Sequence, residues 1–326
     1  MIYVDGDNDN NYKKVKIMSA NVETMYSAGR QVPWHGLGKV IDEAPTSADA
    51  IKLAGLDWTV ETKPVFTDSG IAIPGYYANM RSSDNSVLGI VGDRYQVVQN
   101  SEAFSFTDSL IEEGDVRYET AGSLRGGKTV WMLAKMPEQK ILDDKFDPYI
   151  CFTNSHDGTG AIKICMTPIR VVCNNTLNLA LRNAKRTWSA KHTGSISTKL
   201  DEAKETLGLA NKYMEELNNT AEILAYEKID EEYLNKFLSE LFPVSASDSE
   251  LKKSRAEDAK ANFMVAYYMP DISQYRGTKY GLVNAITDMV DHAAPVRNTK
   301  DYQSNNWSRI LNGHKVVDAA YSILTR

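Results

Sequence analysis

Residues 153–176 read TNSHDGTGAIKICMTPIRVVCNNT and hold several side chains that could do chemistry. His156 and Asp157 are adjacent, which invites a metal-dependent nuclease or phosphohydrolase. That chemistry needs further His and Asp ligands on helices to hold divalent metals. Here the pair lies in a glycine-rich turn between two predicted strands, where Asp-Gly is ordinary hairpin chemistry. The metal-dependent enzyme is therefore kept as a third interpretation.

The three cysteines, Cys151, Cys165 and Cys173, offer two other chemistries. With His156 they could bind zinc, but their spacings of 14 and 8 residues differ from those of compact zinc knuckles. Cys173 could be a nucleophile if His192 acted as its base. An odd number of cysteines without a CxxC pair fits a reducing compartment, so we expect no disulfide framework and a cytoplasmic protein.

The segment LRGGKT, residues 124–129, is a weaker candidate for a phosphate-binding loop. The segment lacks the spacing of a P-loop, and we expect neither ATP nor another cofactor. As the tip of a hairpin it could present Arg125 and Lys128 to a phosphate, or it could be a plain turn.

Charge is distributed unevenly along the chain. Between residues 158 and 200 there are seven basic residues and no Asp or Glu, although the whole chain has a net charge of −6. The rest of the chain therefore carries −6 − 7 = −13. We call these seven basic residues the basic island. It either binds an anion or is neutralised by acidic residues elsewhere in the fold. Its members are Lys163, Arg170, Arg182, Lys185, Arg186, Lys191 and Lys199.

An aromatic residue accompanies these cations in TWSAKHTGS, residues 187–195, which we expect to end a basic helix. Trp188 lies near Lys191 and His192 in sequence. Charge that follows a backbone, together with aromatic stacking, is how proteins hold single strands without reading their sequence. The alternative is that Trp188 closes the core between the sheet and the helical part.

The elements that would position these residues form an α+β unit: an antiparallel β-meander covered by helices. Thr46 or Ser47 is expected to cap a first helix, and Asn100 or Ser101 to cap a second helix that ends at Gly114. Pro168 implies an edge strand or a bulge. Strands are predicted at 58–66, 71–79, 87–91, 117–124, 129–136, 147–154 and 161–173, and a basic helix at 174–186.

The C-terminal part is predicted to be mostly helical. From Leu200 to Leu224, apolar residues alternate in steps of three and four, which is an a/d seam. That seam either packs on the protein's own helices or joins two copies. Further helices are predicted at 230–242, 250–268, 279–293 and 304–324, and Gly313 is a candidate break in the last of them.

These patterns divide the chain into a flexible N-terminal arm (1–28), an α+β core with the basic face (29–198) and a helical region (199–326). No run of 18 apolar residues is present, so we expect no transmembrane helix. The N-terminus has no charged, apolar and small-residue pattern, so we expect no signal peptide.

Seven segments carry a resemblance to a known family: PWHGLG, YQVVQNSEAF, the GG-x-TVW hairpin, NSHDGTGA, TPIRVVCNNTLNLAL, KHTGSI and NAITDMVDH. In order, over residues 28–320, they resemble the phage/plasmid-like protein family, catalogued as domain of unknown function nine-three-two. The resemblance implies an origin in a mobile element, and therefore a place in the cytoplasm of a bacterial host cell. It transfers no catalytic residues. More distantly, the order of elements resembles that of single-strand annealing proteins of the Red-beta type, whose rings or filaments hold DNA in a basic groove.

We therefore expect a non-enzymatic, oligomeric protein of a phage or plasmid that binds and anneals single-stranded DNA. The alternative is a protein-binding module that counters a host defence, with a host or phage protein as its partner. The residues expected to contact nucleic acid are Arg125, Lys128, Lys163, Arg170, Arg182, Lys185, Arg186, Trp188, Lys191 and His192.

Overall fold

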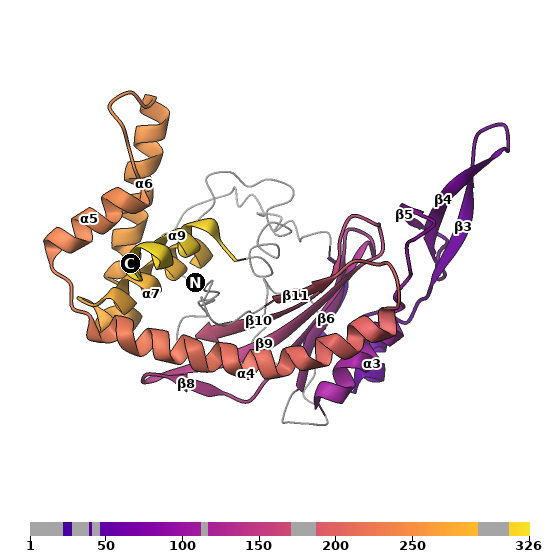
Figure 1. Cartoon of the computed structure of the whole chain (residues 1–326), viewed down its shortest axis with the longest axis horizontal. Coiled ribbons are helices and arrows are strands. Elements are labelled where there is room, and N and C mark those ends of the chain that lie inside the picture. The colour runs from indigo at the N-terminus through magenta and orange to yellow at the C-terminus, as the bar shows by residue number, and fades with distance from the viewer. Residues whose placement is uncertain (1–21, 28–38, 41–45, 112–116, 171–186, 293–312) are drawn as a thin grey trace, which may run out of the picture.

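The computed structural model describes residues 22–27, 39–40, 46–111, 117–170, 187–292 and 313–326. It confirms the predicted α+β class: two β-sheets, built almost wholly from antiparallel pairs, are followed by a helical C-terminal part (Figure 1). The predicted basic helix at 174–186 and the segment PWHGLG lie outside the described residues.

The larger sheet has the strand order β11-β10-β9-β7-β6-β1-β2, and β8 pairs with β9. The predicted hairpin around residues 125–128 is confirmed as β6 and β7. The prediction that a flexible arm reaches residue 28 is wrong for residues 22–27, because β1 pairs with β6. The strands are β1 (Val22–Ser27), β2 (Lys39–Val40), β6 (Arg117–Leu124), β7 (Thr129–Lys135), β8 (Gln139–Ile141), β9 (Asp144–Ser155), β10 (Ile162–Arg170) and β11 (Thr187–Ala190).

The central strands are apolar on both faces, as expected for strands buried on both sides. On β10, Ile162 and Ile164 point into the main core, whereas Cys165 belongs to a smaller cluster on the opposite face. Pro168 lies beyond the four residues of β10 that pair with β11. There it needs no ladder hydrogen bond on that side, which is how a strand tolerates proline.

The smaller sheet has the order β3-β4-β5 and projects from one end of the molecule (Figure 1). Its strands confirm the three predicted near residues 58–91: β3 (Val60–Phe66), β4 (Ala72–Arg81) and β5 (Val87–Gly92). Helix α2 (Ser47–Leu53) precedes it, and the Thr46 side chain caps that helix by accepting from Asp49 N–H, as predicted.

Helix α3 (Asn100–Ile111) follows the small sheet. The prediction that Asn100 or Ser101 caps it is wrong, because the helix already includes Asn100. The side chain of Glu102 accepts from the backbone N–H of Gln99 instead. The Asn100 amide is buried and used for a tertiary contact described below. The predicted end at Gly114 lies outside the described residues.

Helix α4 (Ile196–Tyr226) lies across the larger sheet and leads to the C-terminal helices (Figure 1). The part of its apolar seam at Tyr213–Leu224 packs into the protein's own core: Met214, Leu217, Ala221 and Leu224 are buried there. The remaining helices are α5 (Glu231–Leu241), α6 (Glu250–Tyr267), the 3-10 helix η1 (Pro270–Tyr275), α7 (Lys279–His292) and α9 (Lys315–Leu324).

One continuous cluster of buried side chains runs from α2 through the larger sheet to α9. It joins the sheet to the helical part through α4, which contacts β10, β8 and α7. Among the described helices, none is both long enough and apolar enough to cross a bilayer.

Candidate nucleic-acid interface

Four loops meet at one end of the larger sheet. They are residues 92–96 at the end of β5 and beyond it, the β6–β7 tip at 125–128, the β9–β10 turn at 156–161, and 191–195 after β11. The backbone N–H of His156 donates to Lys128 O over 2.8 Å, and that of Gln96 donates to His192 O over 2.8 Å. These contacts bring together four of the segments that carry the family resemblance: YQVVQNSEAF, GG-x-TVW, NSHDGTGA and KHTGSI.

Beneath the loops, five polar side chains form a cluster that we call the amide joint. Four of them are buried and Gln99 is half-buried: Asn79, Gln99, Asn100, Asn154 and His156. Each amide nitrogen donates to a backbone carbonyl of a distant segment. Asn79 donates to His156 O over 2.8 Å, Asn154 to Val98 O over 3.0 Å, and Gln99 to Val60 O over 2.9 Å. The amide joint therefore fixes the small sheet, the start of α3 and the β9–β10 turn against one another.

The His156 ring is fully buried and has a defined tautomer. Because Asn100 Nδ2 donates to Leu56 O, Asn100 Oδ1 is left as the acceptor, and His156 Nε2 donates to it over 2.9 Å. The edge of the ring meets Trp58, with ring centroids 5.3 Å apart. Burial, and then the charge of His192, lower the pKa of His156 to about 3, so the ring is neutral near pH 7.

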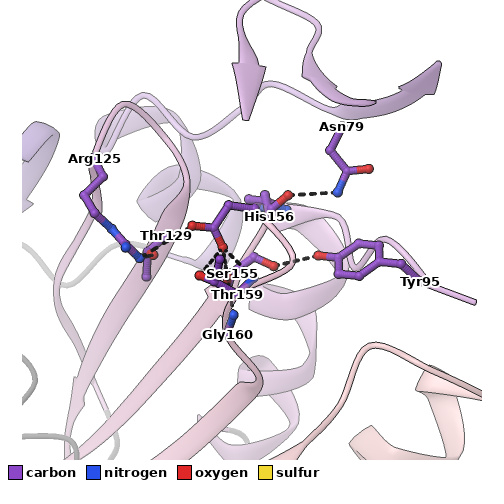
Figure 2. Close-up of polar contacts among 9 residues, drawn as sticks. Asn79, Tyr95, Arg125, Thr129, Ser155, His156, Thr159 and Gly160 are labelled. Carbon is purple, nitrogen blue, oxygen red and sulfur yellow. Dashed lines mark hydrogen bonds and ion pairs between the residues drawn. The ribbon is translucent and has the colours of Figure 1, made fainter. Parts of the chain in front are cut away.

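Asp157 organises the turn that follows through contacts with Ser155 and Thr159, which Figure 2 labels. Its Oδ1 accepts from the hydroxyls of Ser155 and Thr159 and from the backbone N–H of Thr159. Burial alone would raise the pKa of Asp157, but these hydrogen bonds and the charge of Arg125, 3.9 Å away, lower it. The carboxylate is thus ionised and occupied in holding the turn.

Tyr95 connects the first loop to the others. Its hydroxyl donates to Ser155 O over 2.6 Å (Figure 2), and its ring stacks on His192 at a centroid distance of 4.6 Å. His192 Nδ1 in turn donates to Gln96 O over 3.0 Å. Burial and the nearby Asp157 raise the pKa of Tyr95, so its hydroxyl remains a donor.

The outer surface of the four loops is basic, and we call its four exposed cations the basic rim: Arg94, Arg125, Lys128 and Lys191. The same loops contain two carboxylates, Asp93 and Asp157, so their net charge is 4 − 2 = +2. This local sign is opposite to that of the whole chain. The loops also hold many glycines, which lets backbone N–H groups approach an anion closely. These are Gly92, Gly126, Gly127, Gly158, Gly160 and Gly194.

The structure separates the residues that the sequence proposed as one surface. Arg125, Lys128 and Lys191 lie on the basic rim. Trp188 is opposite Ile164 in the strand register and packs against the main core, whereas Lys163 is opposite Ser189 and faces the other way. His192 is buried under Tyr95. Arg170 lies in β10, and the remaining three, Arg182, Lys185 and Arg186, lie outside the described residues.

Residues 187–190 form strand β11, so the prediction that TWSAKHTGS ends a helix is wrong. The segment pairs with β10, and its alternating pattern of exposed and half-buried residues is typical of a strand. Trp188 closes the core at this edge, near α4. A strand of only four residues offers little sequence signal, which explains the error.

Those residues proposed for metal chemistry that the structure describes are not gathered into a cluster. Cys151 and Cys165 are buried opposite each other on the sheet face away from His156. Cys173 lies outside the described residues. Within the described part of the chain, no group of three or more His, Cys, Asp or Glu side chains could hold a metal ion.

Sequence reasoning missed Arg94 and the whole amide joint. Arg94 stands alone between acidic and apolar residues in GDRYQVVQN, so its local sequence gives no basic signal. Only the contacts of Tyr95 and Gln96 bring it beside the other loops.

Comparison with protein families gives one match, to the domain of unknown function DUF932, over residues 87–311. The match spans more than half of the chain, and the protein belongs to this family. No curated protein and no solved structure matches the chain.

Proposed function

We propose that this protein is a non-enzymatic, oligomeric protein of a phage or plasmid that binds single-stranded DNA and anneals complementary strands. The observation that supports the proposal best is the basic rim. Four cations from three separate loops share one end of the sheet, in a chain whose net charge is −6. Phosphate binding depends on charges neutralised at the contact, so a local surface suffices for a chain that is acidic elsewhere.

The amide joint supports the same function because it holds the rim in place. The four loops are tied to each other and to the sheet by buried and half-buried hydrogen bonds, so little ordering is required when a strand binds. Annealing needs neither ATP nor a metal: neutralised phosphates and unstacked bases lower the barrier to pairing.

The proposal is tested by fluorescence anisotropy of labelled single- and double-stranded oligonucleotides across a salt series. We expect single strands to bind with micromolar or better affinity and to weaken steeply with salt. The Arg125→Glu/Lys128→Glu double variant should bind more weakly, and its salt slope should fall by about 0.7 for each phosphate that it no longer neutralises. The matched control is Lys140→Glu/Lys236→Glu, which reverses two exposed cations away from the rim.

Annealing is measured separately, with two complementary labelled strands in EDTA. Faster pairing with the wild-type protein than without it supports the proposal. If neither strand form binds at low salt, the function is wrong and a protein partner becomes the better candidate. Cleavage that appears on adding magnesium, manganese or zinc would favour the nuclease interpretation. An Arg182→Glu/Arg186→Glu variant tests the remaining part of the basic island in the same assays.

A further inference from the structure

The small sheet has one face against the body and one face exposed. Asn79, Arg81 and Val91 point toward the body and are buried. The opposite, outer face carries Tyr76 and Ile90, whose side chains are 56% and 51% exposed. Apolar and aromatic side chains at this level of exposure, grouped on one sheet face, indicate a binding surface.

The outer face is flat beside the Tyr76 ring. Tyr76 is paired in register with Gly92, which has no side chain, and the next cross-strand pair on this face joins the small Ala78 to Ile90. A Cβ added at Gly92 would meet only Gly75 O, at 3.9 Å. The neighbouring position on the sheet is thus open, and a planar group has room to lie against the phenol ring.

The outer face adjoins the basic rim at the end of β5. Gly92 is the last residue of β5, and Arg94 follows it in the turn. That turn is fixed by hydrogen bonds from Asp93 N–H to Gly75 O (3.2 Å) and from Tyr95 N–H to Gly92 O (3.0 Å). Tyr76 is therefore one cross-strand step from the loop that carries Arg94.

We infer that Tyr76 is a stacking residue for a nucleobase of a bound single strand, whose phosphates lie along the basic rim. The inference rests on the proposed function and specifies its contact. A charged surface that follows the backbone, next to an exposed aromatic ring, is the arrangement by which proteins bind single strands with little sequence preference. Charge complementarity selects this occupant: the adjoining loops carry +2, which favours a polyanion.

The outer face is not uniformly basic, so we assign to it contacts with the bases of the strand and not with its phosphates. Lys63 lies opposite Ala78, but its ammonium is paired with Glu61 at 3.2 Å. The phosphates are therefore bound by the rim, and the outer face contributes contact with bases. A single strand meets both requirements, whereas a duplex keeps its bases stacked inside.

The test compares a labelled thymidine oligonucleotide with an abasic oligonucleotide of the same length, by anisotropy. Tyr76→Leu should weaken binding of the thymidine strand about 5- to 100-fold and leave the abasic strand unchanged. Tyr76→Phe keeps the ring and should bind as the wild type does. Gly92→Leu fills the open position and should also weaken only the thymidine strand. Tyr226→Leu, at a tyrosine that is 89% exposed at the end of α4, is the matched control.

A measurement on the wild-type protein guards against variants that fold poorly. An oligonucleotide with 5-iododeoxyuridine is crosslinked by light, and the crosslinked peptide is mapped; we expect it to contain Tyr76. If neither oligonucleotide binds, the proposed function itself fails. If both bind but Tyr76→Leu has no effect and crosslinks occur only elsewhere, the stacking inference is wrong and the function stands. In that case the apolar outer face is better explained as a protein-binding surface.

Discussion

His156 Nε2 donates to Asn100 Oδ1 over 2.9 Å, and this bond joins the β9–β10 turn to the first residue of α3. The two residues are 56 positions apart, and both side chains are buried. His156 also donates its backbone N–H to Lys128 O and accepts from Asn79 at its carbonyl. The contact with Lys128 holds the β6–β7 loop of the basic rim, and the other two hold the β9–β10 turn beside it, so the histidine acts as a structural centre of the candidate interface.

Replacing His156 with alanine should destabilise the fold by about 3 kcal/mol. The variant leaves a buried amide oxygen of Asn100 without its donor and opens a cavity beside Trp58. Urea unfolding followed by circular dichroism measures the change, and Ser83→Ala, at an exposed position, is the control. A variant as stable as the wild type that loses only a metal-dependent activity would contradict the structural role.

The buried His156 ring should also make the free energy of unfolding depend on pH. Its pKa is about 3 in the folded protein and 6.5 in the unfolded chain, so the unfolded chain binds more protons between these values. The free energy of unfolding is therefore unaffected above pH 6.5 and falls as the pH drops from 6.5 toward 3, by up to about 1.4 kcal/mol per pH unit.

The measurement compares wild type with His156→Gln at several pH values between 4 and 8. The variant lacks the titrating group, so its stability should fall less steeply below pH 6.5. The lowered pKa of Asp157 also removes stability in acid, but it is present in both proteins and cancels in the difference. Parallel curves would show that His156 titrates normally and is not buried as described.

Two glycines on β5 should respond differently to substitution. A Cβ at Gly89 would lie 2.5 Å from both Cα and O of Asp157, because the β9–β10 turn packs directly on this strand. Gly89→Ala should therefore cost about 1–3 kcal/mol of stability. Gly92→Ala has open space and should change stability little. Thermal unfolding of the two variants measures this, and equal effects would mean that the small sheet is not docked on the turn.

Sequence patterns predicted the elements whose signals are local. The hairpin around residues 125–128 and the helix begun by Thr46 depend on turn glycines and a capping side chain within a few residues, and both are confirmed. Strand β1 was missed because its partner, β6, lies about 95 residues away, a separation that no periodicity reveals. Asn100 was assigned to a cap because its amide can serve either purpose, and only the fold decides between them.

The candidate site was predicted only in part, because some of its residues have a local sequence signal and others are placed by tertiary contacts. Arg125, Lys128 and Lys191 stand in turns, and turns between strands gather at the ends of a sheet. The direction of Trp188 depends on the β10–β11 register, which fixes it on the core face. The place of Arg94 depends on tertiary hydrogen bonds of its neighbours. Turn and charge patterns along the sequence could find the first group, but not the direction of Trp188 or the place of Arg94.

The apolar seam of α4 provides the last prediction. Leu217 is fully buried in the protein's own core, whereas Ile223, six residues later, is 61% exposed. Leu217→Ala should cost about 2–5 kcal/mol in urea unfolding, and Ile223→Ala should cost little in the isolated chain. Light scattering of both variants then tests the two roles left open for the seam. Because Leu217 is covered within one chain, its variant should keep the wild-type oligomeric state at temperatures where it is folded. Dissociation caused by Leu217→Ala in a folded protein would instead place this part of the seam between copies.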